Sequence, residues 1–282
     1  MPELPEVETI KRQVIDIIKN KHITNIVVNN HKLRKIINIP SGLAINEPCI
    51  DIHRRNKYII VETNSYWLVI HLGMTGTLRL NNQTLQSHDQ VLIHFSDCPT
   101  LILNDPRRFG LFMVYNKAQY QYNQLPEIED LGFEPLDSNF TQSSFNKLYK
   151  MKKEMNIKNF LMDGHCVCGI GNIYASEILF DTKIYPLAKI KEIDEAVMKS
   201  IYSSIRKILK KAIEQGGSSI SDFKNVYGSS GNMQNYHKVY NKENLNCVIC
   251  NDKILKITQS GRSTFYCPKC QTNGLTNNNR SK

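Results

Sequence analysis

The stretch GRSTFYCPKCQ, residues 261–271, contains two cysteines, Cys267 and Cys270, in a Cys-x-x-Cys turn. A second turn of this type, CVIC, places Cys247 and Cys250 upstream, and 16 residues separate the two turns. Each turn directs two thiolates towards one point, and four thiolates complete the tetrahedral shell that Zn²⁺ prefers. The spacing therefore predicts a zinc finger over residues 240–273 with one structural Zn²⁺.

The remaining cysteines do not continue this pattern. They are scattered, and we expect packed thiols at Cys49, Cys98, Cys166 and Cys168. No run approaches 18 apolar residues, so no membrane span is predicted. The first residues lack the basic and apolar regions of a signal peptide, which makes the cytoplasm the expected location.

The charge of the chain is unevenly distributed. Residues 1–140 contain 14 Lys/Arg and 15 Asp/Glu, whereas residues 141–282 contain 22 and 11. A basic half suggests a polyanionic partner, most often a nucleic acid. A general bias of the chain towards Lys, Asn and Ile explains the same charge equally well.

Periodicity divides the chain into a β-rich first half and a helical second half. A helical stripe follows Pro5, and short β-like runs then cover residues 23–115, as in a sandwich or barrel. Helical patterns return after a polar segment at 117–140, and a glycine pair ends the long helix over 194–215. We predict an α+β protein with a β-sandwich domain at 1–135, a helical domain at 136–239, the finger at 240–273 and a disordered tail at 274–282.

The opening MPELPEVETI places Pro2 and Glu3 side by side. Removal of Met1 would leave Pro2 with a secondary α-amine, whose pKa of about 8 makes it more available as a nucleophile than a lysine. Glu3 could then shuttle protons beside it. On physical grounds alone the simpler reading comes first, namely that proline and the glutamates merely favour a helix start.

Three further motifs are open to two readings each. GIGN (169–172) is either a tight helix–helix turn or an anion cradle with basic surroundings. DPRRFG (105–110) is either a surface turn or a probe that inserts Phe between bases. HLGMTG (71–76) carries Met74, which either fills the core or acts as a second wedge. A separate stretch, RRNKY (54–58), contains Lys57, which in the simpler reading is an exposed lysine at a strand edge.

Taken together, these motifs resemble the formamidopyrimidine-DNA glycosylase family over residues 1–272. Their order along the chain is MPELPEVET, RRNKY, HLGMTG, DPRRFG, GIGNIYASE and then the two Cys-x-x-Cys turns. The most specific matches are PELPEVE at the start and GRSTFYCPKCQ near the end, and GIGNIYASE lies between them. The resemblance implies a helix–two-turn–helix around GIGN and an N-terminal β-sandwich. MDGHCVC before GIGN and VYNKENLNC before the finger depart from the family pattern.

The resemblance also implies residue roles. Pro2 would be the Schiff-base nucleophile and Glu3 the acid/base, while Lys57 would assist β-elimination and Arg262 δ-elimination. The remaining implied DNA contacts are Met74, His88, Arg107, Phe109, Lys153 and Asn172, of which Met74, Arg107 and Phe109 would fill the gap left by the flipped base. The loop near 217–235 would cover that base. The role of Glu6 stays open between orienting the amine and favouring the helix start.

The resemblance implies a monomeric base-excision repair enzyme that flips oxidised purines out of damaged double-stranded DNA, excises them and cleaves the strand by β,δ-elimination. Two rivals remain. The endonuclease VIII branch of the superfamily prefers oxidised pyrimidines but typically begins PEGPE, where this chain has Leu4. A non-enzymatic zinc-ribbon DNA-binding protein explains the basic half and the cysteines, but leaves PELPE unexplained.

Overall fold

A computed structural model describes residues 1–29, 32–37, 39, 46–81, 85–219 and 223–273. The chain divides into two compact units, one formed by residues 1–130 and 213–234, the other by 131–212 and 235–282. The boundary between the two units at residues 130 and 131 lies inside the polar segment 117–140. The predicted tail at 274–282 lies outside the described residues.

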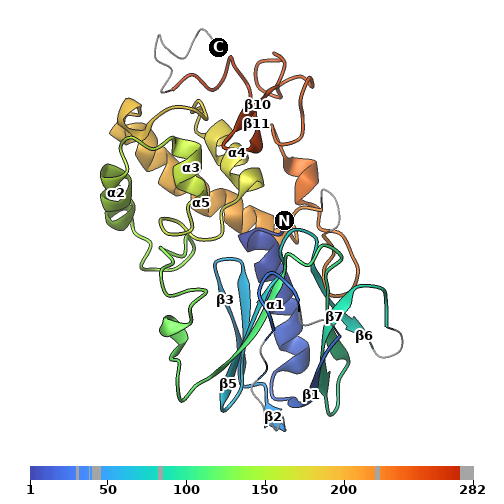
Figure 1. The fold of residues 1–282 in the computed structure, drawn as a ribbon. Coiled ribbons are helices and arrows are strands. Elements are labelled where there is room, and N and C mark those ends of the chain that lie inside the picture. The colour runs from blue at the N-terminus through green and yellow to red at the C-terminus, as the bar shows by residue number, and fades with distance from the viewer. Residues whose placement is uncertain (30–31, 38, 40–45, 82–84, 220–222, 274–282) are drawn as a thin grey trace. The chain divides into compact units, whose positions relative to one another are not determined.

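The first unit is built on the predicted N-terminal helix, α1 (Leu4–Ile18). Its buried stripe of Val7, Ile10, Val14 and Ile18 recurs at the spacing of one helix face, and all four belong to one large hydrophobic core. The same core takes residues from both sheets of this unit, so α1 and the sheets are held together by one buried cluster (Figure 1).

The first of these antiparallel sheets has the order β2-β1-β7-β8-β6. Its strands are β1 (His22–Val28), β2 (Glu47–Pro48), β6 (Thr77–Asn81), β7 (Asp89–Phe95) and β8 (Thr100–Asn104). The second has the order β3-β4-β5-β9. Its strands are β3 (Asp51–Arg55), β4 (Tyr58–Glu62), β5 (Tyr66–His71) and β9 (Leu111–Asn116), and the short helix η1 (Tyr122–Gln124) follows them. These sheets confirm the predicted β-rich half.

Sequence patterning missed β3. Only Ile52 among its residues is buried, and the segment reads DIHRR, so no apolar alternation marks it. The strand forms because its backbone pairs with β4 in register, from Asp51 opposite Glu62 to Arg55 opposite Tyr58. This pairing places Lys57, a candidate site residue, in the tight turn between the two strands.

The second unit is mainly helical, as predicted. It contains α2 (Gln142–Met151), α3 (Ile157–Met162), α4 (Asn172–Asp181), η2 (Ile190–Glu192), most of α5 (Glu195–Glu214) and the end of η3 (Met233–Tyr236). The glycine pair ends α5 as expected, since Gly216 and Gly217 both have left-handed φ angles. The hairpin of β10 (Leu255–Gln259) and β11 (Arg262–Tyr266) completes the unit, which confirms the α+β class and the C-terminal finger.

No helix among the described residues is both long enough and apolar enough to cross a membrane.

Candidate functional site

The N-terminal turn places Pro2 and Glu3 directly at the start of α1. Glu3 occupies the N-cap position, and both residues are buried, whereas Met1 is 46% exposed. The backbone N–H of Glu3 donates to Oε2 of Glu6 over 2.8 Å. An amine at Pro2 would therefore stand beside a carboxylate whose backbone is held by the first turn of the helix, which suits a nucleophile and its proton carrier.

Glu6 also binds the segment that follows α5. Its second oxygen, Oε1, accepts the backbone N–H of Ser218 over 2.7 Å, and Glu6 itself is only 1% exposed. Gly217 has φ +80°, and a Cβ there would lie 2.8 Å from Glu6 Oε1. Only glycine fits this contact without displacing the carboxylate. The contact with Glu3 agrees with the reading in which Glu6 favours the helix start, and the same carboxylate also binds the loop at 217–218. That Glu6 orients the Pro2 amine stays a prediction.

The loop predicted near 217–235 has no helix or strand among its described residues before η3, and residues 220–222 lie outside the described part of the chain. Phe223 and Val226 return to the core of the first unit. The N–H of Gly231 donates to Ser219 Oγ over 2.9 Å, and Met233 N–H donates to Gly217 O over 3.0 Å. The described ends of this loop are therefore tied to one another.

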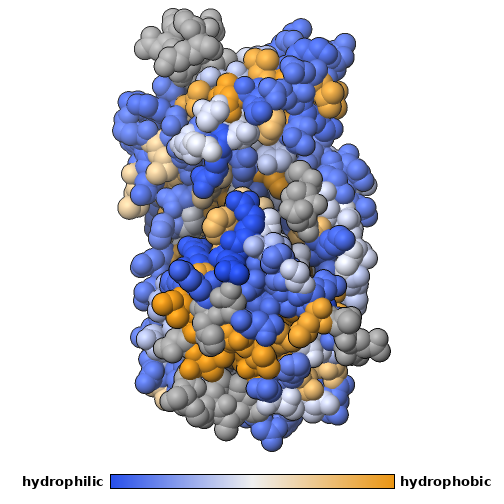
Figure 2. Space-filling view, turned by 45° about the vertical axis from the view of Figure 1, so that its right-hand side comes forward, coloured by the Kyte–Doolittle hydropathy of each residue, from blue (hydrophilic) through white to orange (hydrophobic). Residues whose placement is uncertain are grey.

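Met74 and Phe109 lie on two neighbouring turns of the first unit. Their side chains are 44% and 47% exposed. Other large hydrophobic side chains, such as those of Ile36 and Tyr227, are exposed as well, and hydrophobic patches are visible on the face shown in Figure 2, so exposure alone does not distinguish these two. Phe109 is distinguished by its neighbour, because the Arg107 guanidinium stacks over its ring, with 4.8 Å between Cζ and the ring centroid. An apolar wedge next to an arginine suits insertion into a base stack.

Lys57 and His71 lie close enough to interact electrostatically. Burial lowers the pKa of His71 to about 3, and repulsion from Arg34 and Lys57 acts in the same direction. The neutral ring accepts the Gly73 N–H at Nδ1 over 2.9 Å. This hydrogen bond supports the turn that presents Met74.

A pH dependence of stability follows from His71. Its pKa in the folded protein lies below the usual 6.5, so the unfolded chain takes up a proton that the folded chain does not. The contribution is present above pH 6.5 and is lost as the pH falls, by about 1–2 kcal/mol between pH 7 and pH 5. Urea denaturation of the wild type and of His71→Asn should show the steeper acid loss in the wild type. Equal pH dependence in both would contradict a neutral His71.

In the second unit, Lys153 and Arg262 are exposed, and Asn172 is half-buried at the first position of α4. Asn172 Oδ1 accepts from the buried Lys158 Nζ over 2.6 Å, and its Nδ2 donates to Ser263 O over 2.8 Å. Lys158 Nζ also donates to Thr264 Oγ1 over 2.6 Å. The GIGN turn is thereby joined to β11, whose first residue is Arg262.

Sequence reasoning missed two buried charged residues of this unit. One is Lys158, whose place in a short helix between the buried Ile157 and Phe160 is the available signal of a structural role. The other is Glu177, whose carboxylate accepts the backbone N–H groups of residues 238–240 over 2.9–3.0 Å and whose pKa is raised by burial. A single acid within the apolar run YASEILF is the available signal.

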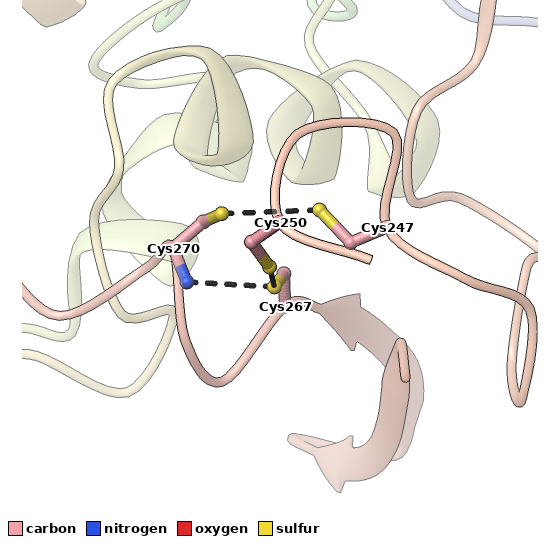
Figure 3. A group of neighbouring side chains, drawn as sticks. All are labelled: Cys247, Cys250, Cys267 and Cys270. Atoms are coloured by element: carbon pink, nitrogen blue, oxygen red, sulfur yellow. Dashed lines mark hydrogen bonds between the residues drawn. The ribbon is translucent and has the colours of Figure 1, made fainter. Parts of the chain in front are cut away.

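The four finger cysteines converge as predicted (Figure 3). All four Sγ atoms lie within 4.8 Å of one another, with 3.8 Å between Cys247 and Cys270 and 3.4 Å between Cys250 and Cys267. Tetrahedral zinc with Zn–S bonds of about 2.3 Å separates its sulfurs by about 3.8 Å. The cluster fits one structural Zn²⁺ with a closed, all-protein shell.

The cysteines that depart from the family pattern are buried. Cys166 is 2% exposed, and Cys168 is fully buried with its thiol within 3.3 Å of Gly132 O. Burial raises the pKa of Cys166 to about 11. Both are packed thiols, as their separation from the finger motif suggested.

Three family models match successive segments of the chain. The formamidopyrimidine-DNA glycosylase N-terminal domain matches residues 1–112, the formamidopyrimidine-DNA glycosylase H2TH domain matches 131–224, and the zinc finger found in FPG and IleRS matches 245–273.

Individual relatives agree with these matches. The formamidopyrimidine-DNA glycosylase of Wolbachia sp. subsp. Drosophila simulans (strain wRi) is 44% identical, over 96% of this chain and 100% of the relative. That of Legionella pneumophila (strain Lens) is 41% identical, over 96% and 98%.

Solved structures agree as well. The MutM (FPG) protein of Thermus thermophilus has a TM-score of 0.86 at 31% identity, over 97% of this chain and 100% of that one. A Lactococcus lactis Fpg complex with abasic-site DNA has a TM-score of 0.82 at 32% identity, over 95% and 99%.

Proposed function

Because the chain belongs to the formamidopyrimidine-DNA glycosylase family, whose members are base-excision repair enzymes with glycosylase and AP-lyase activity, we propose that it excises oxidised purines from double-stranded DNA through a Schiff base on Pro2. Its substrates are 8-oxoguanine and formamidopyrimidines. The supporting observation is the buried Pro2–Glu3 pair at the start of α1, with the Glu3 backbone held by Glu6.

In the proposed reaction, the unprotonated Pro2 nitrogen attacks C1′ of the flipped nucleotide and the base leaves. Glu3 takes the N–H proton of the attached Pro2 nitrogen and gives a proton to the sugar ring oxygen as the C1′–O bond of the ring breaks, which leaves an iminium between Pro2 and C1′. The iminium makes the C2′ proton acidic, so the 3′ phosphate leaves by β-elimination and the 5′ phosphate by δ-elimination. Lys57 assists the first elimination and Arg262 the second.

The other site residues act on the DNA before chemistry. Flipping a base costs a few kcal/mol, and insertion of Met74, Arg107 and Phe109 offsets part of that cost, with Arg107 facing the orphan cytosine. His88, Lys153 and Asn172 contact the DNA. The zinc supplies folding energy for the finger that presents Arg262 and takes no part in the reaction.

We also propose domain limits of 1–135, 136–239 and 240–273, a monomeric state, and a cytoplasmic location with nucleoid association when the protein is bound to DNA. The basic second half of the chain is consistent with DNA as the partner, since lysine and arginine neutralise DNA phosphates and release counterions.

Lesion preference tests the proposed substrate class. We expect single-turnover excision of 8-oxoguanine opposite cytosine to be at least about tenfold faster than excision of thymine glycol, because Arg107 donates to the orphan cytosine. Oligonucleotide cleavage with both lesions in the same sequence measures this ratio. A preference for thymine glycol would assign the chain to the endonuclease VIII branch. Tight binding without any cleavage of abasic-site DNA would instead contradict the proposed enzyme.

A further inference from the structure

The proposed DNA contacts of the first unit come from three separate turns. Met74 lies between β5 and β6, His88 precedes β7, and Arg107 and Phe109 lie between β8 and β9. All four side chains are exposed. A wedge built from separate turns works only if the turns keep a fixed spacing, because small displacements of contacting groups weaken an oriented complex steeply.

Asp105 contacts all three turns, two of them through its buried carboxylate and the third through its backbone. Asp105 is 0% exposed. Its Oδ2 accepts the Gly110 N–H over 2.6 Å, and its Oδ1 accepts the Arg107 N–H over 3.3 Å and the Thr75 hydroxyl over 3.4 Å. Its own backbone N–H donates to His88 O over 3.0 Å. Each hydrogen bond therefore ends on an exposed contact residue or on its immediate neighbour.

The backbone around Asp105 leaves no room for adjustment. A Cβ at Gly110 would lie 2.9 Å from Asp105 Oδ2 and 2.9 Å from His71 O. A Cβ at Gly73, which has φ +63°, would lie 2.4 Å from the carbonyl carbon of Phe109. The Met74 turn and the Phe109 turn thus touch through their backbones, with the carboxylate beside the contact.

We propose that Asp105 is a positioning residue for base flipping, which sets the relative placement of Met74, His88, Arg107 and Phe109 without touching the DNA. This inference rests on the proposed function, because the spacing of these side chains matters only if they insert into DNA. The 2.6 Å contact with the Gly110 N–H has the short length typical of a strong hydrogen bond to a carboxylate, and the longer contacts of Arg107 and Thr75 share the other oxygen, so one carboxylate joins the Met74 turn and the Phe109 turn.

Asp105→Asn is the informative change because it preserves size and shape. The amide offers one acceptor oxygen, and its NH₂ group faces a backbone N–H that the carboxylate had accepted, which leaves a buried donor unpaired. Thr75→Val removes the single hydroxyl contact and is the milder variant. Asp51→Asn is the control for loss of a carboxylate outside the three turns, since the half-buried Asp51 accepts the Ile52 N–H over 2.9 Å and the Lys19 ammonium over 3.1 Å at the start of β3.

The experiment separates flipping from chemistry. For Asp105→Asn we expect single-turnover excision of 8-oxoguanine from duplex DNA to fall about tenfold, with a smaller fall for Thr75→Val. Borohydride trapping on single-stranded abasic DNA, which needs no flipping, should stay within about twofold of the wild type. The fluorescence increase of 2-aminopurine placed beside the lesion should be reduced at saturating protein. Asp51→Asn should match the wild type in all three assays.

The outcomes are distinguishable. If wild-type protein forms no trapped adduct, the proposed function fails and this inference fails with it. If the wild type traps DNA but Asp105→Asn and Thr75→Val both excise duplex lesions at the wild-type rate, only the role of Asp105 is wrong. An equal loss of trapping on single-stranded DNA and of duplex excision would likewise overturn a positioning role, because it would indicate a general structural defect.

Discussion

Pro2→Gly is expected to reduce the borohydride-trapped adduct with abasic-site DNA by at least about a hundredfold. The proline nitrogen is a secondary amine, so its adduct at C1′ is a permanently charged iminium, which activates C2′ without a further protonation. A glycine amine gives an imine that must first be protonated, and glycine also releases the ring constraint that directs the amine beside Glu3. Gel separation of the reduced adduct measures the loss directly.

Pro5→Ala is the matched control for this change. Pro5 stands in the first turn of α1 and is buried like Pro2, but it has no terminal amine to offer. It should trap DNA at close to the wild-type level. Intact-mass measurement on the same samples should find the wild type without Met1. Retention of Met1 together with efficient trapping would exclude Pro2 as the nucleophile.

Cys267→Ser should lose zinc and duplex DNA binding together. Three thiolates cannot close the tetrahedral shell, and the binding free energy of a structural zinc, about 10–16 kcal/mol, is also the folding free energy of its module. The hairpin of β10 and β11 carries Arg262 and packs its Phe265 into a small core with Cys247, Cys267 and Ile254. We expect affinity for lesion DNA to fall at least about a hundredfold.

Zinc content by atomic emission and a DNA titration measure both effects in one preparation. Cys98→Ser is the control, since Cys98 lies in the first unit, outside the metal cluster, and that variant should retain one zinc per chain. One zinc per chain in Cys267→Ser would contradict the four-cysteine site. Zinc loss with unchanged DNA affinity would contradict the structural role assigned to the finger.

The sequence predicted those features that local patterns specify. The stripe of α1, the glycine stop of α5 and the cysteine spacing each reflect one repeating geometry, and the structure has all three. The buried carboxylates could not be assigned roles in this way. Asp105 was visible in DPRRFG, yet its partners Thr75 and His88 lie 30 and 17 positions away, and only the pairing of β6 and β7 with β8 brings them together.

The same limit applies to Lys158 and Glu177. Each looks like an ordinary charged residue of a helical segment, and each is buried because it bonds to residues more than 60 positions later in the chain. Asn172 illustrates the converse. The GIGN motif identifies it as a candidate, but its side chain already bonds Lys158 and Ser263, so the proposed contact with DNA would have to share these partners.

The two hydrogen bonds that the Glu6 carboxylate accepts affect how variants of this protein are interpreted. Glu3 and Ser218 donate to opposite oxygens of one carboxylate, and Gly217 packs against its stem. A substitution at Gly217 or Ser218 is thus expected to disturb the helix start next to Pro2, the proposed nucleophile, and a substitution at Glu6 is expected to disturb the loop. Loss of excision in a loop variant therefore does not identify a lesion-recognition residue, because the same variant can misplace the nucleophile.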